Sequence, residues 1–144
     1  MAPAPSDGTF AKPHRISRWA TVGRVAWGVV YVGGGVSHFA LAGFNTDAYA
    51  RFTEWARPPT WGQATWDSVF MAHPSVYASL LGGYEIATGV LLLKGGRTAV
   101  WGFWAALAFH VALMFFGFGI WLYCLPAIAL LALILRAHLK VLKA

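Results

Sequence analysis

The chain has 144 residues, of which 58% are hydrophobic and 11% are charged, and its mean hydropathy is +0.58. In a soluble domain about 25% of the residues are charged, so this composition indicates an integral membrane protein. At about 20 apolar residues per crossing, the chain has room for roughly four spans and for no separate soluble domain.

The formal net charge of +6 at pH 7 does not point to nucleic acid, because the cations lie beside hydrophobic runs and do not form one soluble basic face. The only cysteine, Cys124, lies inside an apolar run. A disulfide framework and a Cys-x-x-Cys redox pair are therefore excluded. A quinone-reducing thiol oxidoreductase that works with paired cysteines is excluded with them.

The N-terminal segment is polar and contains three prolines before the first apolar run. We expect residues 1–18 to form a flexible basic cytoplasmic tail. The apolar run from Val22 to Phe44 is long enough to cross a bilayer and has no evident cleavage site. We therefore interpret it as a retained first span and not as a signal peptide.

A loop of about 31 residues, Asn45 to Ser75, follows the first span. The Pro58-Pro59 pair and Pro74 divide it into two short helices, which we expect to lie along the outer membrane surface. Three tryptophans suit an interfacial belt between lipid and water: Trp55, Trp61 and Trp66. A loop of this length is usually structured or functional, and two interpretations stay open: a cap on the bundle or a lid over a buried site.

Three further apolar runs predict the remaining spans: Val76 to Leu93, Thr98 to Phe118 and Ile120 to Leu135. Tight turns join them, so they should be antiparallel neighbours. Pro126 in the last run removes one backbone donor and can kink that helix. The sequence thus predicts an all-α, four-helix membrane domain over residues 19–136, followed by a basic cytoplasmic tail over residues 137–144.

The charge distribution predicts the orientation of these spans. Nine of the eleven lysines and arginines fall on one side of the predicted topology: Lys12, Arg15, Arg18, Arg24, Lys94, Arg97, Arg136, Lys140 and Lys143. The positive-inside rule makes that side cytoplasmic. Both termini are then cytoplasmic, and we expect the protein in a bacterial plasma membrane.

Small residues repeat every seven positions in the first two spans. Gly28, Gly35 and Ala42 form one series, with His38 three residues after Gly35. Gly82 and Gly89 form the other series, with Glu85 three residues after Gly82. Positions i, i+3 and i+7 share a helix face. Small residues let membrane helices approach closely, so His38 and Glu85 should face the interior of the bundle.

We expect His110 in the third span to point inward as well. Tyr31 lies seven residues before His38 and can share the helix face of His38. A rise of about 1.5 Å per residue from the cytoplasmic cations gives heights of about 21 Å for His38, about 13 Å for Glu85 and about 20 Å for His110. We expect the two histidines to be level, with Glu85 roughly one turn deeper. These four side chains are the candidate ligand-binding residues.

The stretch "GYEIATGVLLLKGGRTAVWGFWAALAFH" resembles the second-to-third-helix signature of DoxX-like membrane proteins, in which a glutamate is followed by a glycine, a leucine-rich stretch, a glycine-containing turn and an apolar helix. "GGGVSHFALAGF" resembles the end of that family's first helix. The resemblance covers Arg18 to Arg136. It implies a compact four-helix membrane bundle linked to redox complexes, and Glu85 matches the family glutamate.

These features favour a redox-associated membrane subunit that binds a quinone-like lipophilic molecule among the polar side chains, with a membrane redox protein as partner. An accessory or binding subunit fits better than a stand-alone enzyme, and no catalytic residue is assigned. Two other classes stay open: a scaffold whose ionisable groups only fix helix pairing, and a haem or metal protein using His38 and His110. No metal ligand is assigned, and the sequence leaves a homo-oligomer open.

Overall fold

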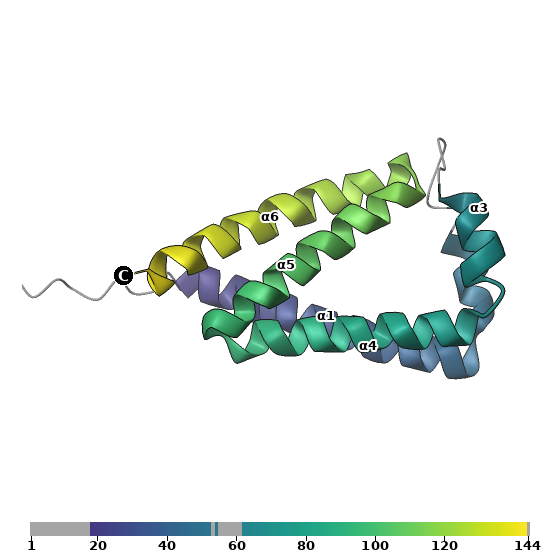
Figure 1. Ribbon diagram of the computed structural model, residues 1–144, viewed down its shortest axis with the longest axis horizontal. Coiled ribbons are helices and arrows are strands. Elements are labelled where there is room, and N and C mark those ends of the chain that lie inside the picture. Colours follow the sequence, from purple (N-terminus) through teal and green to yellow (C-terminus); the bar gives the residue numbers. More distant parts are fainter. Residues whose placement is uncertain (1–17, 53, 55–61, 144) are drawn as a thin grey trace, which may run out of the picture.

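The computed structural model describes residues 18–52, 54 and 62–143. Four helical segments are long and apolar enough to cross a membrane: α1 (Arg18–Phe44), α4 (Pro74–Lys94), α5 (Gly96–Leu113) continued by η3 (Met114–Phe116), and α6 (Phe118–Leu142). Figure 1 shows α1 beside α4, with α5 leading from the end of α4 towards α6. The predicted all-α four-helix bundle is confirmed.

The helix bounds differ most from the prediction at the C-terminal end of the chain. The fourth span was expected to end at Leu135, but α6 continues to Leu142 with Pro126 inside it. His138 explains the extension, because its ring is only 3% exposed and its Nε2 lies 2.8 Å from the carbonyl oxygen of Gly96. Residues 137–142, predicted as part of a basic tail, thus form the packed end of a helix. Of the predicted N-terminal tail, only Arg18 lies among the described residues.

The turn between α4 and α5 needs glycine. Gly95 and Gly96 have φ angles of 75° and 56°, in the left-handed region that other residues rarely adopt. Arg24 of α1 donates from its Nη1 to the carbonyl oxygens of Leu92 and Leu93 at the end of α4. Those carbonyls have no partner within the helix. Arg24, predicted only as a topology signal, therefore caps α4.

The two seven-residue series meet, as the sequence indicates. A Cβ atom added at Gly35 would lie 2.5 Å from the carbonyl oxygen of Gly82, and one added at Gly89 would lie 2.7 Å from that of Gly28. At Ala42, the next residue of the first series, the backbone carbonyl oxygen accepts a hydrogen bond of 3.0 Å from the Ser75 hydroxyl. The backbones of α1 and α4 are thus in contact along most of their length.

The long loop contains two short helical stretches, as expected. The first is η1 (Thr46–Arg51), and the second combines α3 (Gln63–Thr65) with the π-helical turn η2 (Trp66–Phe70). Five side chains from the loop and η3 form an aromatic cap: Tyr49, Phe52, Trp66, Phe70 and Phe116.

The prediction that Trp66 belongs to an interfacial belt is wrong. Its side chain is only 6% exposed, because its ring stacks on Phe70 with centroids 4.0 Å apart and its Nε1 donates to the Tyr49 carbonyl oxygen over 3.2 Å. Trp55 and Trp61 lie outside the described residues.

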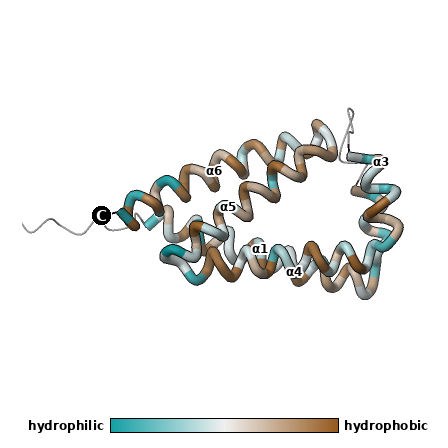
Figure 2. Tube along the Cα trace, viewed as in Figure 1, coloured by the Kyte–Doolittle hydropathy of each residue, from teal (hydrophilic) through white to brown (hydrophobic). Residues whose placement is uncertain are grey.

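The helices form two pairs that meet at one end. In Figure 1 the α5–α6 pair diverges from the α1–α4 pair towards the side where the aromatic cap lies. The main hydrophobic core contains residues from all four helices, among them Ala20, Leu92, Phe103 and Leu131. Figure 2 shows hydrophilic stretches at the C-terminal end of α6, at the α4–α5 turn and in the loop, with hydrophobic helix between them.

We predict that Gly35→Ala destabilises the protein by about 1–3 kcal/mol. The new methyl group would meet the backbone of α4, so the helices have to separate. Thermal unfolding in detergent, followed by circular dichroism, measures the effect.

Gly33→Ala is the matched control, because a Cβ atom there meets nothing within 4 Å. It should be neutral or stabilising by less than about 1 kcal/mol, as expected from helix propensity alone. Equal unfolding midpoints for the two variants would contradict the contact between α1 and α4.

Candidate functional site

The α1–α4 contact brings Glu85 to His38. Because Gly35 faces Gly82, the two polar residues are attached about six residues apart along the pair, which is about 9 Å. Side chains tilt towards the N-terminus of their own helix. In antiparallel helices Glu85 and His38 therefore lean towards each other, and His38 Nε2 lies 3.6 Å from Glu85 Oε2.

Gly34 makes room for the carboxylate. A Cβ atom at this position would lie 2.7 Å from Glu85 Oε2. Gly34 is three residues after Tyr31 and four before His38, so the three positions share one face of α1. Glu85 thus lies between Tyr31 and His38 along that face.

Tyr49 of η1 completes this group from the loop side. Its hydroxyl lies 2.6 Å from His38 Nδ1, and the two rings stack with centroids 5.7 Å apart. Burial and the negative charge of Glu85 raise the pKa of Tyr49 above its ordinary value, so the phenol stays protonated at neutral pH. With the phenol as donor to Nδ1, the proton of a neutral His38 lies on Nε2, the atom that faces Glu85.

A second polar pair connects α1 to α5. The ring nitrogen Nδ1 of His110 lies 2.8 Å from the carbonyl oxygen of Ala106 and 3.2 Å from the Tyr31 hydroxyl. A carbonyl can only accept, so Nδ1 carries a proton. The Tyr31 hydroxyl also lies 3.2 Å from the Ala106 oxygen and can donate to it.

His110 is held in an aromatic enclosure. Trp27 contacts the ring edge to face with centroids 5.6 Å apart, and the Tyr123 ring lies at 5.5 Å. The side chain is 1% exposed. Its Nε2 is buried without a hydrogen-bond partner among the described residues, and so is Glu85 Oε2. Most buried polar atoms are paired, so each of these two atoms marks a position where a ligand can supply the missing partner.

An apolar cavity of about 360 Å³ lies between α4, α5 and the aromatic cap, and none of the four candidate residues lines it. Tyr84 and Phe109, each the residue before a candidate polar residue, line it. Phe109 also contacts Tyr31 and Tyr84, with ring centroids 5.9 and 6.0 Å away. The Phe109 ring thus forms a wall between the cavity and the Tyr31–His110 pair.

The four candidate residues fall into two pairs and not into one network. Glu85 contacts His38, whereas Tyr31 contacts His110, and within residues 18–52, 54 and 62–143 no hydrogen bond or ion pair joins the two pairs. Within the same ranges, no group of three or more His, Cys, Asp or Glu side chains could hold one metal ion.

Sequence reasoning missed two contributors. Tyr49 lies in the loop, and only its position near a predicted helix start could have suggested contact with α1. Gly34 belongs to neither seven-residue series and was not singled out, although its spacing from Tyr31 and His38 places it on the polar face.

Comparisons of the chain with family models, curated proteins and solved structures found no match. The resemblance to DoxX-like proteins therefore stays a hypothesis based on the quoted residues.

We predict that His38→Leu lowers the free energy of unfolding by about 1–2 kcal/mol, because it leaves the buried Glu85 carboxylate without its nearest donor. Adding Glu85→Gln should recover part of that loss, since the remaining group is neutral. Chemical unfolding of the wild type, the two single variants and the double variant gives a coupling energy, expected at about 0.5–2 kcal/mol. Simple additivity would show that the two side chains do not interact.

Proposed function

We propose that this chain is a DoxX-like integral membrane protein that binds a quinone-like lipophilic molecule between its helices. One observation supports this most: two ionisable side chains on different helices each keep one buried polar atom that has no hydrogen-bond partner among the described residues, Glu85 Oε2 and His110 Nε2. Buried ionisable groups in membrane spans are costly and are typical of ligand or proton pathways. The apolar cavity that Tyr84 and Phe109, their sequence neighbours, help to line is of a size that suits a small ring system with an apolar tail.

The chemistry of these two atoms, which lack a hydrogen-bond partner among the described residues, matches the oxygens of a quinone head group. With its proton on Nδ1, His110 offers Nε2 as an acceptor, which suits a quinol hydroxyl. Glu85 accepts from a hydroxyl when ionised and donates to a carbonyl when protonated. Two such groups can accept the protons that a quinol releases on oxidation or supply those that a quinone needs on reduction.

The chain would act as an accessory subunit in this function. Oxidation of a quinol also needs an electron acceptor, and the single cysteine offers no dithiol pair. A membrane redox protein as partner would supply that acceptor. We propose the same orientation as the charge distribution indicates, in a bacterial plasma membrane with both termini cytoplasmic.

We predict that Glu85→Gln and His110→Phe each weaken the binding of a short-chain ubiquinone analogue at least tenfold. Each variant changes one unpartnered atom and nearly keeps the volume of the side chain, so the fold should persist. Quenching of tryptophan fluorescence by the analogue, in purified protein in detergent, measures the affinity.

The matched controls are Glu54→Gln and His73→Phe, which change the same residue types at exposed positions. They should bind the analogue as the wild type does. A second matched pair compares Gly34→Ala, which displaces the carboxylate, with Gly33→Ala, which meets nothing. Wild-type affinity in folded Glu85→Gln and His110→Phe would overturn the proposed function.

A further inference from the structure

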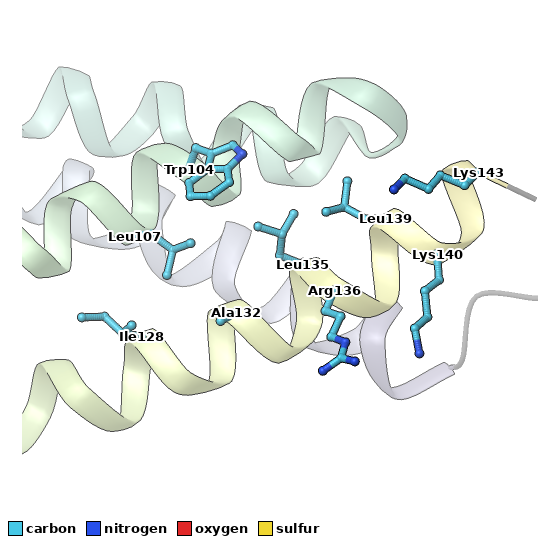
Figure 3. Close-up of a pocket in the computed structure, with 9 residues that line it drawn as sticks. All are labelled: Trp104, Leu107, Ile128, Ala132, Leu135, Arg136, Leu139, Lys140 and Lys143. Carbon is cyan, nitrogen blue, oxygen red and sulfur yellow. The ribbon is translucent and has the colours of Figure 1, made fainter.

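A groove of about 590 Å³ runs between α5 and α6 in the half of the bundle near the C-terminus. Figure 3 shows Trp104 and Leu107 of α5 on one side of it, facing Leu135 and Leu139 of α6. Ile128 and Ala132 continue the same lining away from the helix end. The lining is almost entirely apolar, and it is separate from the polar pairs described above.

The length of the groove fits one leaflet of a bilayer. From Ile128 to Leu139 the helix rises about 16 Å, which is about half of a hydrocarbon core of about 30 Å. The next residues, Lys140 to Lys143, would then lie at the depth of the head groups. An acyl chain lying along the apolar part would therefore place its own head group beside these residues.

Three cations surround that end of the groove: Arg136, Lys140 and Lys143. In Figure 3 the Lys143 side chain points back towards Leu139, while the Arg136 and Lys140 side chains point away from α5, on the other side of α6. None of the three makes a side-chain hydrogen bond or an ion pair with the part of the chain that the structure describes. Neither α5 nor α6 contains an aspartate or a glutamate. The charge at this end is thus positive and without a counter-charge within the two helices.

We propose that this groove binds an anionic phospholipid, with an acyl chain along the apolar lining and the phosphate on Arg136, Lys140 and Lys143. Basic pockets at the ends of membrane helices are suited to acidic head groups. Arg136 supplies a planar donor pair for a phosphate, and the two lysines supply point charges. The site needs neither the quinone-like ligand nor the polar residues of the proposed function.

The test uses the full chain in phosphatidylcholine vesicles. A small fraction of the lipid carries brominated acyl chains, and this brominated lipid is either phosphatidylglycerol or phosphatidylcholine. Bromine quenches a nearby tryptophan, and subtraction of the Trp104→Phe signal isolates Trp104, which lines the groove. Brominated phosphatidylglycerol should reach half-maximal quenching of Trp104 at a lipid fraction at least tenfold lower than brominated phosphatidylcholine does.

Neutralising the three cations together as Arg136→Gln, Lys140→Gln and Lys143→Gln should abolish this preference, because about fivefold per cation amounts to about a hundredfold for all three. The control changes three cations at the same end of the bundle that do not line the groove: Arg18→Gln, Lys94→Gln and Arg97→Gln. It removes equal charge and should change the preference less than twofold. An equal loss in both triple variants would overturn the proposal in favour of a diffuse surface potential.

Ala132→Phe tests the apolar half, because it fills the groove, and Leu133→Phe is its control on an exposed neighbouring position outside the lining. Of these two variants, only Ala132→Phe should reduce the quenching of Trp104 by brominated phosphatidylglycerol. Equal quenching by the two lipids in the wild type would overturn the proposal. A second result would also overturn it: the wild type is a dimer, and Ala132→Phe converts it to a monomer without changing the quenching of Trp104 by lipid. The groove would then hold a second copy of the chain.

Discussion

The backbone contact between α1 and α4 is the constraint on which the rest of the structure depends. In a bilayer the hydrophobic effect does little to bring helices together, so close packing and polar contacts must do so. Gly28 against Gly89 and Gly35 against Gly82 provide that packing. The same approach gives Glu85 a place beside Gly34, within reach of His38. Larger residues in either series would separate the helices and leave the carboxylate without both its space and its partner.

The sequence predicts this part of the fold well because helix periodicity and residue size are local properties. Spacing alone identified the faces of α1 and α4 that meet, and hydropathy identified the four spans. The grouping of the polar residues could not be predicted in the same way, since it depends on the rotation of α5. In the structure, His110 contacts Tyr31 and the Ala106 carbonyl, whereas the carboxylate contacts His38. The end of α6 escaped prediction for a similar reason, because His138 binds a turn 42 residues earlier in the chain.

Polar and charged groups occupy different parts of the bundle, with different consequences. The cations gather at one end, where Arg24 caps α4 and three residues of α6 surround the lipid-sized groove. The carboxylate and the two histidines lie further along the helices, and Tyr49 of the aromatic cap contacts His38. A ligand in the interior and a phospholipid at the surface would thus use separate residues, although both would contact α5.

Different contacts join the α1–α4 pair to the α5–α6 pair at the two ends of the bundle. Near the C-terminus, all four helices share a core, and His138 is bonded to the glycine turn. At the loop end, Trp66 and Phe116 meet ring against ring, 5.5 Å apart, without a directional bond. Separation of the pairs there would also break the hydrogen bonds that the Tyr31 and Tyr84 hydroxyls make to α5. The apolar cavity between α4, α5 and the aromatic cap, however, opens at the side of the bundle, towards the membrane. A molecule that enters by this route is drawn from the bilayer, and its supply depends on how strongly it partitions into lipid rather than on its concentration in water.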